Sequence, residues 1–222
     1  MSARQKAWVA LADGTTFAGF AFGASGPSSG EVVFTTGMTG YQEVLTDPSY
    51  CGQIVTMTAP HIGNTGINPD DPESEDGKPQ VAGFVMRDPS PLAWSWRSRE
   101  TLDDYLARHG IVAIGGVDTR RLTRHIRDPD AHNGCIGTEA PQQLVERARA
   151  APPMEGLDLV ARVTPALAYE FTESGGVWAA NAQSVPAGER PHVVAIDYGA
   201  KRNILRCLVD AGCRVTAVPA TT

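Results

Sequence analysis

Residues 192–218, HVVAIDYGAKRNILRCLVDAGCRVTAV, decide the fold class. Apolar residues run through 192–196, recur at helical spacing within 201–210, and return over 214–218 after Gly212, a residue that commonly ends helices. This pattern predicts a strand, a helix and a second strand, a βαβ unit of the α/β class. A continuous apolar strand is typical of a parallel sheet covered on both faces, and two strands alone make no stable sheet. We therefore expect a second domain, over 192–222, that is only begun in this chain.

The preceding residues, 1–150, predict a domain of mixed β and α structure. A hairpin is expected over 7–11 and 15–22, with Asp13-Gly14 at its turn. Further strands are expected at 31–36, 53–58, 81–86 and 111–114, and helices at 100–109, 119–126 and 141–150. The residues between the domains, 151–191, are rich in proline, glycine and charge and predict a linker with some local structure.

The composition excludes several classes of protein. The chain has 222 residues, 42% of them hydrophobic, and a formal net charge of −6. These values fit a globular protein and offer no basic surface for nucleic acid. The apolar stretch 7–12 is too short for a signal peptide or a membrane span, so we expect a cytoplasmic protein with neither nucleic acid nor membrane as partner.

Standard nucleotide, metal and nucleophile patterns are absent from the sequence. No GxxxxGK[ST] loop occurs, and a single glycine follows the strand at 192–196, where a dinucleotide fingerprint needs three. No CxxC pair occurs, and no histidine stands at zinc-ligand spacing from a cysteine, so we expect no metal and no disulfide. Cys207 falls inside the expected helix, Cys213 begins a strand, and Cys51 and Cys135 are placed in turns, contexts that favour small packing residues over a nucleophile.

Polar residues are most concentrated in three runs of the first domain, at 37–43 (GMTGYQE), 46–50 (TDPSY) and 60–66 (PHIGNTG). Their immediate interpretation is structural: we expect these runs to form turns that pack against strands. Asp-Pro-Ser suits a type I turn that Asp47 caps, and Gly63-Asn64 suits a tight turn.

The same runs carry a resemblance to a known family. TGMTGYQEVLTDPS at 36–49, PHIGN at 60–64, DTRRLTRHIR at 118–127 and DYGAKRNIL at 197–205 closely resemble the small subunit of carbamoyl-phosphate synthase in order and spacing. The similarity extends over essentially the whole chain. It implies a mixed β/α N-terminal domain of the small-subunit type, followed by the first βαβ unit of a class I glutamine amidotransferase domain with a flavodoxin-like fold.

The resemblance also implies a function. In this family the small subunit hydrolyses L-glutamine through a Cys-His-Glu triad, and the ammonia passes to a large subunit that makes carbamoyl phosphate from bicarbonate for arginine and pyrimidine synthesis. ATP and Mg²⁺ are expected on that large subunit, and no cofactor is expected here. The triad would lie beyond Thr222, so this chain alone should be an inactive fragment. The serine of the family's Asp-Pro-Ser-Tyr motif contacts glutamine, which makes Ser49 the expected substrate-binding residue and not a nucleophile.

Two alternatives of other classes remain open. The chain could be a non-catalytic module that docks to the large subunit. It could also be an independent small α/β binding protein whose short second domain is completed by dimerisation.

Overall fold

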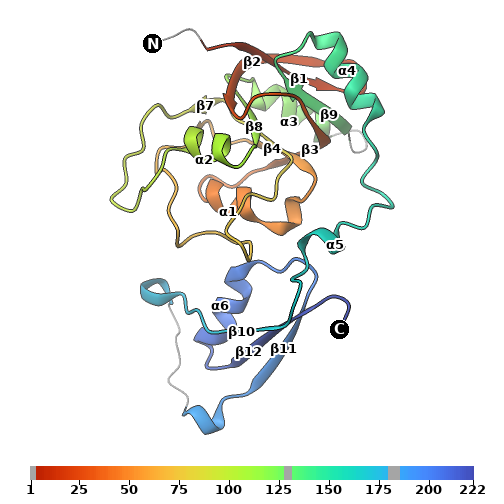
Figure 1. The fold of residues 1–222 in the computed structure, drawn as a ribbon. Coiled ribbons are helices and arrows are strands. Elements are labelled where there is room, and N and C mark those ends of the chain that lie inside the picture. The colour runs from red at the N-terminus through yellow and green to blue at the C-terminus, as the bar shows by residue number, and fades with distance from the viewer. Residues whose placement is uncertain (1–3, 128–131, 180–185) are drawn as a thin grey trace.

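The computed structural model describes residues 4–127, 132–179 and 186–222, and it places a barrel and a smaller sheet at opposite ends of the molecule (Figure 1). Within these residues, seven strands close the barrel in the order β1-β2-β8-β6-β4-β3-β9. They are β1 (Lys6–Leu11), β2 (Thr16–Gly23), β3 (Ser28–Thr35), β4 (Gln53–Met57), β6 (Gly83–Val85), β8 (Val112–Gly115) and β9 (His132–Gly137). Neighbours from β3 through β4 and β6 to β8 run parallel, and the other pairs are antiparallel.

The predicted hairpin is confirmed in β1 and β2, where Val9 lies opposite Phe17. Gly14 has a φ of 97°, which favours glycine, and the Thr15 backbone N–H donates to Asp13 Oδ1 over 2.7 Å. An Asx turn of this kind supplies the reversal that the Asp-Gly pair predicts.

Two apolar clusters stabilise the barrel. One joins strand residues to α3 (Thr119–Arg127), through Leu122 and Ile126, and the other joins strand residues to α1 (Tyr41–Thr46) and α2 (Leu102–Arg108). Helix α4 (Pro141–Ala150) covers β1 and β9 with Leu144 and Ala148, both fully buried. The sequence-based helices at 100–109, 119–126 and 141–150 are thus confirmed, with small differences at their ends.

Two expectations for this part of the chain are wrong. The run 37–43 was expected to form turns packed against strands, yet helix α1 begins at Tyr41 after Gly40, whose φ is 79°. Cys135 was expected in a turn, yet it is buried in β9, between β1 and β3. Residue propensities do not predict this strand, because it contains Gly134 and Gly137 and glycine is usually depleted in strands.

The βαβ unit is present as predicted, with β11 (His192–Asp197), α6 (Arg202–Asp210) and β12 (Arg214–Pro219), and its strands are parallel. A third strand, β10 (Tyr169–Phe171), comes from the residues expected to be linker and pairs antiparallel with β12. Residues 180–185 of that expected linker lie outside the described residues.

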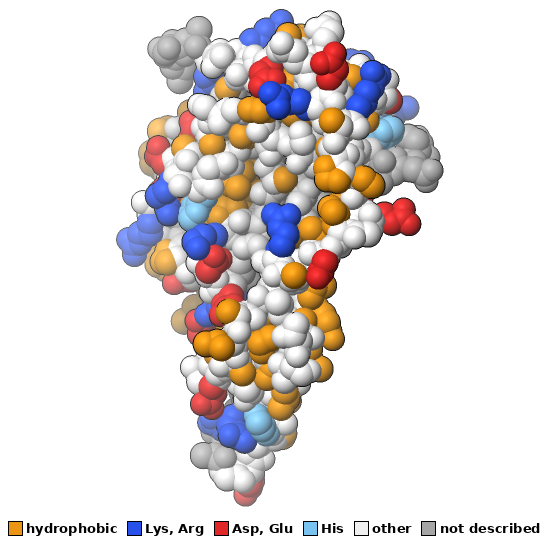
Figure 2. Space-filling model, turned by 45° about the vertical axis from the view of Figure 1, so that its right-hand side comes forward, with side chains coloured by type: hydrophobic (Ala, Val, Ile, Leu, Met, Phe, Trp, Pro, Cys, Tyr) orange, Lys and Arg blue, Asp and Glu red, His pale blue; other side chains and the backbone are white. Residues whose placement is uncertain are grey.

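Among the described residues, helix α6 covers one face of this sheet. Leu205 of α6 packs on that face against Phe171, Val215 and Ala217. On the other face Val194 and Ile196 are 56% and 52% exposed, and the space-filling view shows hydrophobic side chains on the surface of this smaller unit (Figure 2).

Short elements connect these parts: β5 (His61–Ile62), β7 (Asp88–Pro89) and α5 (Val160–Val163), with 3₁₀ turns η1 (Pro48–Tyr50), η2 (Gly176–Trp178) and η3 (Ala187–Glu189). Across the described residues, we find no helix whose length and apolar character would let it traverse a bilayer.

Candidate functional site

Ser49 lies on the 3₁₀ turn η1, where the barrel faces the smaller sheet. Asp47 caps this turn, since its Oδ1 accepts the Ser49 backbone N–H over 2.9 Å, and Pro48 occupies the first position. The sequence-based assignment of Asp47 as the capping residue is therefore confirmed. Asp47 and Pro48 are buried whereas Ser49 is exposed, so the turn presents the serine at the surface.

A loop from the other unit, residues 197–201, approaches this turn. It follows β11, and it is held by Asp197, which is 5% exposed and whose Oδ1 accepts the backbone N–H groups of Gly199 and Ala200 at 2.8 and 2.6 Å. The Asp197 carbonyl also accepts the Thr164 hydroxyl over 2.8 Å. This loop is therefore a fixed element at the carboxyl end of β11.

The approach of the two loops requires glycine at position 199. Gly199 has a φ of 98°, and a Cβ there would lie 3.2 Å from the Pro48 Cβ and 2.7 Å from a Val163 methyl. Glycine permits both the backbone angle and the close contact.

An ion pair fixes the same boundary. Lys201 Nζ lies 2.7 Å from Asp47 Oδ2, and the Asp47 side chain is 4% exposed. The hydrogen bond to Asp47 raises the pKa of Lys201 above its usual value, against a smaller opposing effect of burial. Asp47 thus holds the Ser49 turn with one oxygen and the opposite loop with the other.

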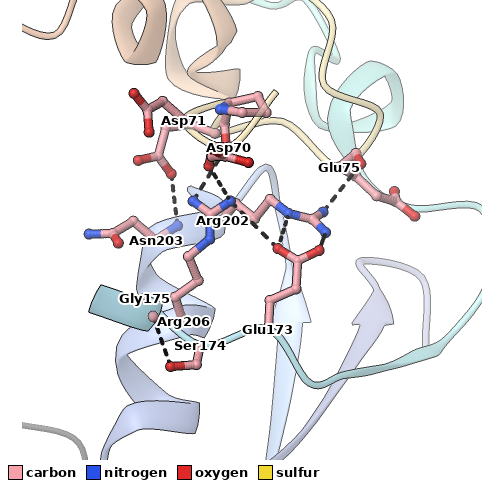
Figure 3. Close-up of polar contacts among 12 residues, drawn as sticks. Asp70, Asp71, Glu75, Glu173, Ser174, Gly175, Arg202, Asn203 and Arg206 are labelled. Atoms are coloured by element: carbon pink, nitrogen blue, oxygen red, sulfur yellow. Dashed lines mark hydrogen bonds and ion pairs between the residues drawn. The ribbon is translucent and has the colours of Figure 1, made fainter. Parts of the chain in front are cut away.

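A second contact, drawn in Figure 3, joins α6 to the loop at residues 70–75. The Glu73 carboxylate accepts the Asn203 backbone N–H over 2.8 Å, and the Glu73 carbonyl accepts that of Arg202 over 2.9 Å. A carboxylate at the first turn of a helix satisfies unpaired N–H groups and interacts favourably with the helix dipole.

The arginines of α6 complete this contact (Figure 3). Arg202 forms a two-pronged hydrogen bond with Glu173, with Nε 2.9 Å from Oε2, and also donates to the Glu75 carbonyl over 3.2 Å. The bond from Arg202 lowers the pKa of Glu173. Arg206 donates to the Asp70 carbonyl over 3.2 Å.

A cavity of about 640 Å³ lies beside this contact. Its lining includes Glu43, Asp71 and Glu73, together with Trp96 and Arg206. Burial, and then the charges of Asp71 and Glu73, raise the pKa of Glu43. The concentration of carboxylates makes this cavity unsuited to an anionic ligand.

The Ser49 turn lies beside the carboxyl end of β11. Ligands of open α/β sheets bind outside the carboxyl ends of the strands, which is where the 197–201 loop meets the Ser49 turn. A hydroxyl both donates and accepts hydrogen bonds. No histidine of the described residues is hydrogen-bonded to it, as an activated serine nucleophile would require.

The sequence predicts Ser49 as a substrate-binding residue but does not predict the groups that position its turn. The Lys201–Asp47 pair spans 154 positions and the Glu73 contact with Asn203 spans 130, and no local pattern signals such distances. Among the cysteines, Cys207 lies in α6 as expected but is exposed, and Cys51 is buried.

The structure therefore defines a mixed α/β protein with a polar boundary between a barrel and an α/β unit. The family described as carbamoyl-phosphate synthase small chain, CPSase domain, matches residues 9–136, and the chain belongs to this family.

Similar curated proteins cover nearly all of this chain. The carbamoyl phosphate synthase small chain of Syntrophotalea carbinolica is 55% identical over 219 residues, which are 98% of this chain and 58% of that protein. Those of Pseudomonas aeruginosa and of a Synechococcus strain are 54% and 52% identical, and cover 96% and 100% of this chain. The chain spans 57% and 56% of the lengths of these two relatives.

Proposed function

We propose that this chain is the N-terminal portion of the small subunit of glutamine-dependent carbamoyl-phosphate synthase. The complete subunit would hydrolyse L-glutamine through a Cys-His-Glu triad outside these 222 residues and deliver ammonia to a large subunit in the cytoplasm. That large subunit would use ATP and Mg²⁺ to form carbamoyl phosphate from bicarbonate, for arginine and pyrimidine synthesis. Within this chain, Ser49 would bind glutamine, and no cofactor would be needed.

The observation that carries this proposal is the position of Ser49. The turn presents an exposed hydroxyl at the boundary where the barrel meets the carboxyl end of β11. A polar amide or charged substrate group fits a hydroxyl of this kind.

The smaller sheet supports a larger second domain of the flavodoxin-like type. Val194 and Ile196 leave one sheet face uncovered, although parallel sheets are usually covered on both faces. The relatives named above are longer than this chain. In the proposed full-length subunit, further elements of the second domain would cover this face of the sheet.

The decisive experiment measures glutaminase kinetics of the full-length small subunit in complex with its large subunit. We expect Ser49→Ala to raise the KM for glutamine by about 3- to 10-fold with little change in kcat, because one hydrogen bond is worth about 0.5–1.5 kcal/mol. Ser25→Ala, which alters another exposed serine, is the matched control. An unchanged KM in Ser49→Ala would rule out the binding role.

The isolated 222-residue chain gives a separate test. Without the proposed triad it should release no ammonia from glutamine above the buffer rate. Hydrolysis that follows the concentration of purified chain would contradict the placement of the triad elsewhere.

A second candidate, a module that docks to the large subunit without catalysis, is favoured by exposed aromatic residues. Trp94, Trp96 and Trp178 are 80%, 87% and 70% exposed, and the Arg97 guanidinium lies 5.8 Å from the Trp178 ring. Large exposed aromatic side chains are typical of interaction surfaces. Capture of the large subunit by this chain, reduced in Trp96→Ala, would support docking; full capture by the variant would exclude Trp96 from the interface.

A further inference from the structure

Three side chains that are far apart in sequence meet at one end of the barrel. Asp13 comes from the β1–β2 turn, His125 from the last turn of α3, and His132 from the first position of β9. One ligand atom from each lies within 4.8 Å of the other two. The expectation of no metal rested on the spacing of histidines relative to cysteines, and this cluster contains no cysteine.

The group is already organised. His125 Nε2 lies 2.6 Å from Asp13 Oδ2, while the other oxygen of Asp13 accepts the Thr15 backbone N–H over 2.7 Å. The two imidazole rings are stacked, with centroids 5.7 Å apart and planes inclined by 29°. These contacts fix the orientation of the carboxylate and of one imidazole before any ligand binds.

One nitrogen in the cluster has no partner. His132 Nε2 is buried and makes no hydrogen bond to any residue that the structure describes. A buried polar atom without a partner has lost its hydrogen bonds to water, so such atoms are rare unless another group satisfies them. The cluster therefore lacks one interaction that its own residues do not supply.

We propose that Asp13, His125 and His132 bind a divalent transition metal, for which Zn²⁺ is the best match. Two imidazoles and one carboxylate are borderline donors that suit Zn²⁺, and three protein ligands leave a fourth position for water. Zinc bonds of about 2.0–2.2 Å in a tetrahedron place ligand atoms roughly 3.3–3.6 Å apart. Asp13 Oδ2 and His125 Nε2, which lie 2.6 Å apart, would separate by about 0.7–1.0 Å, and the distances to His132 would close by at most about 1.5 Å. On binding, His125 releases its Nε2 proton or transfers it to Nδ1.

The donor atoms favour this metal over harder ions. The cavity next to His125 is lined by Arg120, Arg121 and Arg124, with Asp118 as its acidic member. This basic lining opposes every divalent cation, and Mg²⁺ and Ca²⁺ also lack the several oxygen ligands that they need. Imidazole donors, and not net charge, therefore determine the selectivity. The side chains of Asp13 and His125 are 33% and 35% exposed, so an ion reaches the site from solution.

The site would be structural. A bound ion would connect the β1–β2 turn, the end of α3 and the start of β9, the strand that closes the barrel. Because the unfolded chain does not hold these groups together, metal binding would stabilise the folded state.

The test uses the untagged chain after removal of metal with EDTA. Titration with Zn²⁺ in a calorimeter should saturate at one equivalent, and Co²⁺ should produce the intense visible absorption of a four-coordinate site. His132→Gln and Asp13→Asn should each weaken Zn²⁺ binding at least tenfold, since loss of an outer-shell partner alone costs about 10–100-fold. Far-UV circular dichroism of each metal-free variant checks that it folds.

His61→Gln is the matched control, because His61 pairs with Asp88 over 3.1 Å as His125 pairs with Asp13, but without a second histidine. It should leave Zn²⁺ affinity unchanged. Cys207→Ser removes an exposed thiol that could bind zinc adventitiously, and it should also leave the affinity unchanged. Failure of the wild-type chain to bind one equivalent, full affinity in His132→Gln, or loss of binding in Cys207→Ser would each overturn the proposal.

Discussion

The Lys201–Asp47 ion pair gives a quantitative test of how the two parts of the molecule are joined. We expect Lys201→Met to destabilise the chain, because it leaves the carboxylate of Asp47 buried with one partner fewer. A hydrogen bond to a charged group contributes about 1.5–3 kcal/mol, but the Lys201 side chain is 48% exposed, so solvent screening reduces this value. The expected loss in the free energy of unfolding is about 1–2 kcal/mol near neutral pH.

Urea unfolding followed by tryptophan fluorescence measures this loss. The matched control is Lys78→Met, because Lys78 also forms a pair at 2.8 Å, with Asp76, but there both side chains are at least half exposed. That variant should unfold like the wild type, as exposed pairs contribute little. A double-mutant cycle with Asp47→Asn, which keeps an acceptor for the Ser49 N–H, should give a coupling energy of about 1 kcal/mol.

The pH dependence of this pair has a definite sign. Because folding raises the pKa of Lys201, the contribution of the pair is complete below the ordinary lysine value of about 10.4 and is lost as pH rises through the higher folded value. The stability difference between wild type and Lys201→Met should therefore shrink as the solution becomes alkaline. Equal effects of Lys201→Met and Lys78→Met, or a coupling energy near zero, would refute this account of the boundary.

Three other perturbations test separate parts of the fold. Gly199→Ala should destabilise the boundary by at least about 1 kcal/mol, seen as faster limited proteolysis, because its φ is 98° and its new Cβ would meet Val163; unchanged proteolysis would contradict this. Leu144→Ala should lower the unfolding free energy in urea by about 2–5 kcal/mol, since the side chain is fully buried; a loss below 1 kcal/mol would mean that α4 does not pack as described. Glu173→Gln should lower stability at neutral pH but not in acid, because Arg202 lowers the Glu173 pKa and this contribution disappears as pH falls below about 4; acid titration monitored by circular dichroism checks it.

Much of the fold can be predicted from sequence where local chemistry and tertiary structure agree. The Asp13-Gly14 turn between two apolar runs predicts the first hairpin, and helical spacing predicts α2, α4 and α6. The closure of these strands into a barrel cannot be predicted in this way, because it depends on β9. Glycine is required at position 134 of that strand, because a Cβ there would collide with the Val32 side chain. This constraint is visible only after the strands are placed.

The candidate site likewise has a part that local sequence predicts and a part that it does not. The Asp-Pro-Ser motif predicts the turn and the capping role of Asp47, and the family resemblance adds the expectation that Ser49 binds the substrate. The loop that faces Ser49 is recognisable only as the end of a strand, and nothing near Lys201 in sequence indicates Asp47 as its partner. The cluster of Asp13, His125 and His132 is still harder to predict, since Asp13 and His125 are separated by 112 positions.

The pairing of β9 with both β1 and β3 has a consequence for how the chain is made. Trp8 of β1 pairs with Gly137 of β9, so one edge of β1 stays unpaired until residues 129 positions later have been synthesised. Until residues 132–137 leave the ribosome, β1 and β3 each present an unpaired edge, and unpaired edges promote aggregation. Contacts this distant in sequence also slow folding. We therefore expect nascent chains that stop before His132 to be strong chaperone clients, and chains that extend past Gly137 to be released.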